Sequence, residues 1–307
     1  MNLTELWQRH ARHLKLRRRS AYTVTYYAAT GRALTAYLEG EGHQMVAAEV
    51  RIGDLRGFME HLQSRGLAEG GIDAHFRALR GVFGWAVADE LLERDPTKRL
   101  ERPRKPQKLM ETLSPDEYRL LLAEARKGPQ KSRDTALLVT LFDTGLRLAE
   151  VASLQVTDVR LTEGHLRVVG KGNKERVVPL GLRSTEAVDR YIRKARKPKH
   201  PCIPNVFLGR SGEPLTRSGV SQLLADLAAA VSIPRAHAAP HAFRRAFAVN
   251  YLRNGGDVFS LQHVLGHTSL EMTRRYVNLL PEDLKVAHIR VSPADHASLR
   301  GTTGGRP

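Results

Sequence analysis

The sequence predicts a mainly α protein in two parts, an N-terminal helical domain followed by an α+β domain that contains a small antiparallel sheet. Apolar residues recur at helical spacing from Leu3 to about Arg94, the stretch from Asp95 to Gln107 is rich in proline and basic residues, and one later segment alternates like a hairpin. With 307 residues, the chain is long enough for two domains with their own cores.

The composition indicates a polyanionic partner. The formal net charge is +17 and 41% of the residues are hydrophobic, which is typical of a globular, basic protein. Nucleic acid is the usual partner, although an anionic membrane surface would also attract such a chain. The N-terminus lacks the apolar core of a signal peptide and no long apolar run follows, so we expect a cytoplasmic, nucleoid-associated protein without a membrane partner. Cys202 is the only cysteine, which excludes an internal disulfide and disfavours a cysteine-based zinc site.

The first domain, residues 1–96, is expected to be a bundle of roughly four amphipathic helices. Breaks between them fall at Glu39–Gly42, at Gly53 and at Gly66–Gly71. A basic cluster stands just before Ser20, a plausible helix cap, and consists of Lys15, Arg17, Arg18 and Arg19. This cluster is either a solvated face or a grip on phosphates.

Residues 97–110 are the expected linker between the domains. The text DPTKRLERPRKPQ contains Arg104 and Lys105 and carries a strong positive charge. Such a connector either lies extended along a duplex and completes a clamp, or is a flexible, solvated linker without DNA contact.

The second domain, residues 111–292, opens with strong helix signals. From Ser114 the letters SPDE give a cap, a proline at the first helical position and an acidic first turn. An apolar helix over Arg133–Thr144 is closed by Gly145, and LRLAEVASL then starts another helix. Near its start, the guanidinium of Arg147 is suited to gripping two phosphate oxygens, and Glu150 is placed to brace it.

The segment HLRVVGKGNKERVVPL predicts a hairpin with strands at 165–169 and 175–180 around a Gly170–Asn173 turn. Glycine and asparagine supply the left-handed conformations that such a turn needs. Lys171 at the tip is a candidate proton donor, although the residues alone leave Lys174 equally possible.

Pro240 introduces a helix with His241 at its positive end and Arg244 one turn farther on the same face. The first-turn N–H groups and the helix dipole attract an anion there, so this pair predicts a phosphate seat. The alternative is a basic surface turn. Gly255 and Gly256 end this helix.

The next helix has Asp257 as its expected N-cap and Gly266 as its stop, which puts His267 into the turn beyond. Tyr276 follows on a further short helix and is either a core aromatic or a nucleophile. The pair of His263 and His267 has a spacing that suits zinc on a helix, but Gly266 breaks that helix and no third ligand is near, so we expect no metal site.

These segments resemble the boxes of the tyrosine recombinase (phage integrase, Xer-like) family. The matching letters are TGLRLAE, GKGNKER, HAFR, LGH and the tyrosine nine positions after that histidine. The resemblance implies a SAM-like core-binding domain that clamps DNA, followed by the catalytic domain. Two positions depart from the common pattern, Phe243 where leucine is usual and Arg245 where histidine is usual, and Arg245 is expected to contact DNA near the site.

By this resemblance the chain is a site-specific DNA recombinase that works through a 3′-phosphotyrosyl intermediate and a Holliday junction, without metal, ATP or other cofactor. Tyr276 is the implied nucleophile, and the family position favours Lys171 over Lys174 as the proton donor to the leaving oxygen. The remaining implied roles are charge stabilisation by Arg147, Arg244 and His267, proton acceptance by His241, and support by Glu150.

The implied partners are double-stranded DNA, a homo-oligomer on DNA that becomes a tetramer in the synapse, and in some systems a second recombinase or regulator. The helix after the tyrosine packs into a neighbouring protomer in the family, and residues 293–307 are expected to be a disordered tail. Two other functions compete, a type IB topoisomerase-like enzyme and a non-catalytic architectural DNA-binding protein. The LGH box disfavours the first, and the complete set of six chemical residues disfavours the second.

Overall fold

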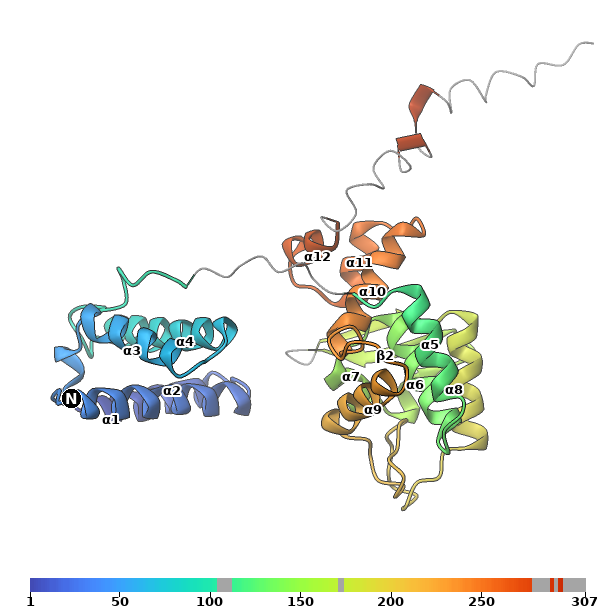
Figure 1. The fold of residues 1–307 in the computed structure, drawn as a ribbon, viewed down its shortest axis with the longest axis horizontal. Coiled ribbons are helices and arrows are strands. Elements are labelled where there is room, and N and C mark those ends of the chain that lie inside the picture. The colour runs from blue at the N-terminus through green and yellow to red at the C-terminus, as the bar shows by residue number, and fades with distance from the viewer. Residues whose placement is uncertain (104–111, 171–173, 278–287, 290–291, 295–307) are drawn as a thin grey trace, which may run out of the picture. The chain divides into compact units, whose positions relative to one another are not determined.

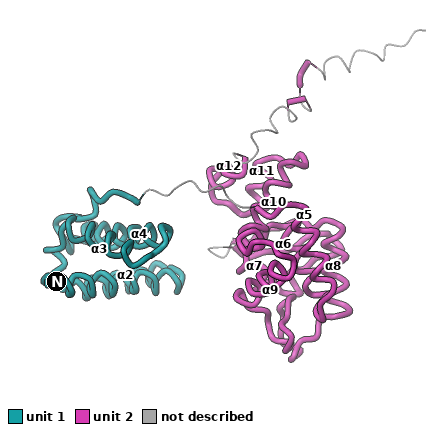
Figure 2. The backbone as a smooth tube through the Cα atoms, viewed as in Figure 1, with its two compact units in different colours: residues 1–109 teal, residues 110–307 magenta. Residues whose placement is uncertain are grey.

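The structure is a computed structural model that describes residues 1–103, 112–170, 174–277, 288–289 and 292–294. The chain divides into two compact units, Met1–Leu109 and Met110–Pro307 (Figure 2). Each unit has its own hydrophobic core. The predicted disordered tail and the helix expected after Tyr276 lie outside the described residues, apart from 288–289 and 292–294. No helix in the described part of the chain is both long and apolar enough to cross a membrane.

The described residues of the N-terminal unit form four helices, as the sequence predicts (Figure 1). They are α1 (Leu3–Leu16), α2 (Ala21–Gly40), α3 (Ile52–Ser64) and α4 (Glu69–Ala88), with a short 3₁₀ turn at Ala47–Glu49. Their apolar faces meet around the fully buried Leu34 and Phe58. Ser20 caps α2 as predicted, since its hydroxyl accepts the N–H of Thr23 at 3.2 Å.

The basic cluster of Lys15, Arg17, Arg18 and Arg19 is exposed where α1 passes into α2. Arg18 has a positive φ of 50°, so the chain reverses there in a tight turn. The four cationic side chains are therefore presented to solvent from the last turn of α1 and the short connection that follows it.

The N-terminal unit packs residues beyond position 96, where the predicted domain ends. Leu100 is buried in its core, and Arg102 pairs with the buried Asp73 through Nε and Oδ1 at 2.7 Å. The physical reason is the apolar Leu100, which covers the core although it stands within a basic run. Arg104 and Lys105 lie outside the described residues.

The second unit is mainly helical. Its helices are α5 (Pro115–Ala125), α6 (Lys131–Thr144), α7 (Leu148–Ser153), α8 (Leu182–Lys194), α9 (Arg217–Ala230), α10 (Pro240–Arg253), α11 (Val258–Leu265) and α12 (Leu270–Val277), and a 3₁₀ turn covers Val156–Asp158. Helix α6 is buried along most of its length and packs against α5, α8 and α10. The predicted capping box of Ser114 and Glu117 opens α5, and Gly145 ends α6 at a φ of 58°.

A three-stranded antiparallel sheet in the order β1-β2-β3 completes this unit. Strands β2 (His165–Val169) and β3 (Glu175–Pro179) form the predicted hairpin, and β1 (Val159–Arg160) is a third strand that the sequence did not predict. Leu166 pairs with Val178, and both are buried. Because side chains alternate along a strand, Arg176 shares the inward face with Val178.

Candidate active site

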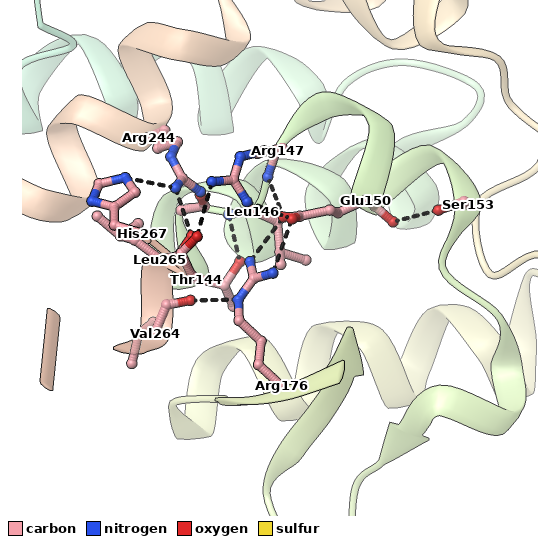
Figure 3. Close-up of polar contacts among 12 residues, drawn as sticks. Thr144, Leu146, Arg147, Glu150, Ser153, Arg176, Arg244, Val264, Leu265 and His267 are labelled. Carbon is pink, nitrogen blue, oxygen red and sulfur yellow. Dashed lines mark hydrogen bonds and ion pairs between the residues drawn. The ribbon is translucent and has the colours of Figure 1, made fainter. Parts of the chain in front are cut away.

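The carboxyl end of α11 holds three arginines that come from distant parts of the chain. Three consecutive carbonyl oxygens there each accept a hydrogen bond from a different guanidinium (Figure 3). The pairs are Val264 with Arg176 Nε at 2.8 Å, Leu265 with Arg244 NH2 at 2.7 Å, and Gly266 with Arg147 NH2 at 3.2 Å. The backbone of one helix end therefore organises all three cations.

Helix α11 offers these carbonyls because it is short and stops sharply. Asp257 caps its start by accepting the N–H groups of Phe259 and Ser260, and Gly266 ends it in the left-handed conformation at a φ of 62°. The last carbonyls of a helix lack partners within the helix, and the negative end of the helix dipole favours cations there. Both predicted boundaries of this helix are confirmed.

Glu150 lies between two of the arginines and is almost fully buried, with a side chain 5% exposed. Its carboxylate accepts the backbone N–H of Arg147 and that residue's NH1, both at 2.8 Å. It also accepts both terminal nitrogens of Arg176 at 2.9 Å. Burial alone would raise the pKa of Glu150, but these hydrogen bonds outweigh burial and hold the pKa below its ordinary value. The carboxylate is therefore ionised and fixes the position of Arg147.

Arg244 is the most deeply enclosed of the cations that line the site, at 5% exposed. It rises from α10 and donates from NH1 to the carbonyl of Gly145 at 2.7 Å, in addition to its bond to Leu265. Burial, followed by the charge of Arg147, lowers the pKa of Arg244 to about 10. Arg244 still carries its proton at neutral pH, but in surroundings short of negative charge.

His267 lies directly after the glycine turn and uses both ring nitrogens. Its Nε2 is 3.0 Å from Arg244 NH2, and its Nδ1 is 2.8 Å from the hydroxyl of the buried Thr273. Because arginine only donates, Nε2 must accept, and the hydrogen of the neutral ring is on Nδ1. Burial and the charges of Arg244 and Arg147 lower the pKa of His267 to about 4, so the ring is neutral at pH 7.

This use of both nitrogens also bears on the alternative of a zinc site, since His267 has no free lone pair to share with His263. Among the described residues no three His, Cys, Asp or Glu side chains are grouped so that they could hold a metal ion.

A cavity of about 240 Å³ opens beside these groups. Its lining consists of Arg147, His241, Arg244, Arg245, His267, Met272, Arg275 and Tyr276. The ring of Tyr276 stacks on that of His267, with centroids 6.1 Å apart and planes 16° from parallel. Partial burial, followed by the charges of Arg245, Arg244 and Arg147, lowers the pKa of His241. The cavity thus combines a phenol, two neutral imidazoles and four guanidiniums.

Five of the six residues that the sequence singled out as catalytic line this one cavity. The sixth, Lys171, lies outside the described residues. Lys174 is exposed directly before the second hairpin strand, and its carbonyl accepts the N–H of Gly170 at 2.8 Å. Tyr276 partly packs against the hydrophobic core and also lines the cavity, so it combines the two alternatives that the sequence left open.

Sequence reasoning missed Arg176, Thr273 and Arg275. The alternation of β3 contained a signal for the first, because it puts Arg176 on the same face as the buried Val178, and a charge on a core face requires a buried partner. Thr273 and Arg275 surround Tyr276 on α12, and only the orientation of that helix brings them to the site.

Fold and site together define a basic, mainly helical protein with a tyrosine beside a cationic cavity. Two family models match the chain, the phage integrase family over residues 111–283 and the phage integrase SAM-like domain over residues 2–102. The chain is 31% identical to the tyrosine recombinase XerD of Listeria monocytogenes over 278 residues, which cover 89% of this chain and 93% of that protein. It is 32% identical to the tyrosine recombinase XerC of Pelotomaculum thermopropionicum, over 82% and 85% of the two chains.

Solved structures show the same fold. The Tn1549 transposon integrase in complex with transposon right end DNA matches with a TM-score of 0.77 at 20% identity, over 90% of this chain and 94% of that one. The XerH site-specific recombinase bound to a palindromic difH substrate matches with a TM-score of 0.71 at 19% identity, over 91% and 82%. The chain belongs to the phage integrase family and is a tyrosine recombinase.

Proposed function

We propose that this protein is a site-specific DNA recombinase in which Tyr276 attacks a backbone phosphate. The observation that carries the proposal is the shared cavity, where Tyr276 stands with the buried Arg244 and with Arg147. In the step, the phenol oxygen of Tyr276 forms a bond to phosphorus while the bond from phosphorus to the 5′-oxygen breaks. The product is a 3′-phosphotyrosyl ester and a free 5′-hydroxyl, and a 5′-hydroxyl from a partner strand reverses the step.

The arginines stabilise the charge that grows on the non-bridging oxygens. Arg147 and Arg244 are held in place before DNA arrives, because each donates to backbone carbonyls that do not move with the side chain. Preorganised donors of this kind are worth about 10²–10³ in rate each. His267 contributes to the same stabilisation through Arg244, because its Nε2 accepts from NH2 and holds that guanidinium in place.

His241 is suited to accept the proton that leaves Tyr276, because its lowered pKa keeps the ring neutral near pH 7. Lys171 is proposed as the proton donor to the departing 5′-oxygen, on its place in the family's hairpin box. Glu150 is the support that orients Arg147. Neither metal nor ATP takes part in this scheme, because the energy of the broken bond is kept in the phosphotyrosyl ester.

Double-stranded DNA is the proposed partner. The net charge of +17 and the exposed cluster of Lys15, Arg17, Arg18 and Arg19 support a clamp in which the N-terminal unit holds the backbone. Arg104, Lys105, Lys174 and Arg245 are proposed as further DNA contacts. Structural relatives include a lambda integrase dimer bound to a core site, which supports assembly on DNA. We propose a tetramer on two duplexes with exchange through a Holliday junction, with or without a second recombinase.

A covalent-capture experiment tests the proposal. The protein is incubated with sheared genomic DNA of its source, denatured, and the strands that remain attached are sequenced to find the site. A nicked suicide duplex of that site is then used to compare the wild type with Tyr276→Phe. We expect a denaturation-resistant adduct at a defined site with the wild type, none with the variant, and recombinant product only when a second site is present.

The competing functions give other results. An architectural protein forms no adduct, and a type IB topoisomerase forms one with little regard to sequence and relaxes supercoils without a second site. Loss of the wild-type adduct on adding a chelator would contradict the metal-free chemistry.

A further inference from the structure

Arg176 is buried and fully hydrogen-bonded, unlike an arginine on the protein surface. Its side chain is 8% exposed on the inward face of β3, and all three guanidinium nitrogens are engaged (Figure 3). The two terminal nitrogens donate to the two oxygens of Glu150 at 2.9 Å, and Nε donates to the carbonyl of Val264 at 2.8 Å. One side chain thus joins the hairpin, the support of Arg147 and the helix end before His267.

Arg176 balances the negative charge of Glu150, which would otherwise fall on Arg147 alone. Arg147 NH1 and Arg176 NH1 share the same carboxylate oxygen, at 2.8 and 2.9 Å. If Arg147 were alone with Glu150, the pair would be close to neutral, and little positive charge would remain for a phosphate. With Arg176 present, one negative charge is divided between two cations, and Arg147 keeps a net positive field towards the cavity.

The geometry makes a second contribution. Arg147 alone holds Oε2 of Glu150 through its backbone N–H and Oε1 through NH1, and the fork of Arg176 holds both oxygens a second time, from the hairpin. Glu150 in turn fixes the backbone N–H and the NH1 of Arg147. The bond from Arg176 Nε to Val264 links the same guanidinium to the turn that contains His267.

We propose that Arg176 is a positioning residue for strand cleavage, which acts through Glu150 to set the orientation and the effective charge of Arg147. The inference rests on the proposed function. It assigns Arg176 no contact with DNA, because Arg176 is buried behind Glu150 and does not line the cavity among the described residues.

The test separates binding from chemistry. Single-turnover cleavage of the nicked suicide duplex is measured at saturating protein, together with the Kd for the same duplex and its salt dependence. The variants are Arg176→Met, Arg176→Lys, and Arg176→Met combined with Glu150→Gln. The matched control is Arg167→Met in the neighbouring strand, whose arginine pairs with Asp158 at the surface and is 46% exposed.

We expect Arg176→Met to cut the cleavage rate about 100-fold while the Kd and the salt slope stay at the wild-type values. Arg176→Lys keeps a charge but not the fork, so its rate should fall between the two. The double variant should recover about tenfold of the loss, because removing the carboxylate charge releases Arg147. Arg167→Met should cleave like the wild type.

The outcomes are separable. If the wild type forms no adduct, the proposed function fails; if the wild type forms one and Arg176→Met cleaves within about threefold of it, only the role of Arg176 is overturned. A double variant as slow as Arg176→Met also overturns it, since a purely structural arginine would not be rescued by removing its partner's charge. Should Arg176→Met not fold, as thermal unfolding would show, the double variant decides: recovery to within about tenfold of the wild type supports the role and loss comparable to Tyr276→Phe rejects it.

Discussion

Gly266→Ala should damage both the stability of the second unit and the chemistry of the cavity. Gly266 has a φ of 62° and a ψ of 48°, where an L-residue costs about 1–2 kcal/mol. A Cβ there would lie 3.0–3.2 Å from Cδ, Nε and Cζ of Arg176. That guanidinium cannot retreat without giving up a charged hydrogen bond to Glu150 or Val264, each worth about 1.5–3 kcal/mol. The expected loss of unfolding free energy is therefore about 2.5–5 kcal/mol.

Gly164→Ala is the control for the backbone contribution. Gly164 also has a left-handed φ, 67°, but nothing lies within 4 Å of its Cβ position. It should therefore cost only the backbone penalty of about 1–2 kcal/mol. The difference between the two variants isolates the collision with Arg176.

The assay must report on the second unit alone, because a chain with two units need not unfold in one step. Both tryptophans, Trp7 and Trp85, lie in the N-terminal unit, so their fluorescence should be unchanged in either variant. Calorimetry and far-ultraviolet circular dichroism then follow the remaining transition. If the two glycine variants lose the same stability within about 0.5 kcal/mol, or if Gly266→Ala cleaves at the wild-type rate, the account of this turn is wrong.

Three further predictions follow from the same structure. Asp257→Ala removes the cap at the opposite end of α11 and should cost about 0.5–2 kcal/mol of unfolding free energy in the calorimetric assay. Its cleavage rate should fall less than that of Gly266→Ala. A larger fall in rate would contradict a local origin for the damage that Gly266→Ala causes. The pKa of His267 falls from 6.5 to about 4 on folding, so the unfolded chain binds more protons and the free energy of unfolding should fall as the pH drops from about 6.5 to about 4. Urea titrations of His267→Asn over this range should show a smaller fall. An unchanged dependence of the unfolding free energy on pH would refute the assignment. Replacing Arg17 and Arg19 by serine should make the slope of log K for DNA against log salt shallower by about 0.9 for each lost phosphate contact, as measured by binding titrations. The cleavage rate at saturating protein should stay constant. An unchanged slope would show that the cluster is a solvated face.

Much of the fold could be predicted because its boundaries depend on local chemistry. Ser114 and Asp257 accept first-turn N–H groups, and Gly145 adopts the left-handed conformation that ends a helix. These preferences act between residues a few positions apart, so they are readable in the text. Five cavity residues were also named correctly as neighbours, but by their resemblance to family boxes and not by any physical rule that brings distant segments together.

The supporting contacts were not predictable in the same way. The bonds from Arg244 to the carbonyls of Gly145 and Leu265 depend on how α10 packs against α6 and α11. Every residue has a backbone carbonyl, so the residue types do not indicate which carbonyls will accept these bonds. Arg176 was nearer to being found. A charge on the inward face of β3 needs a buried partner, and Glu150 is the one charged residue in a short helix of six residues. However, nothing in the spacing links two residues that are 26 positions apart.

Backbone carbonyls hold each of the three arginines, and their use preserves the positive charge of the cavity. A carboxylate for each guanidinium would fix the same geometry but would cancel the charge, whereas carbonyls fix it and add no net charge. In the described part of the chain Glu150 is the one carboxylate that pairs with a guanidinium of this group, and it pairs with Arg147 and Arg176. Arg244 bonds instead to two backbone carbonyls and to His267. The lowered pKa values of Arg244 and His267 show that the uncancelled charge is costly to bury. In the motif LGH, the buried Leu265 anchors the turn in the core, and Gly266 leaves room for Arg176. His267 lies beside Arg244. The three residues therefore fix the turn whose carbonyls hold the arginines, and so maintain the positive charge at the cavity.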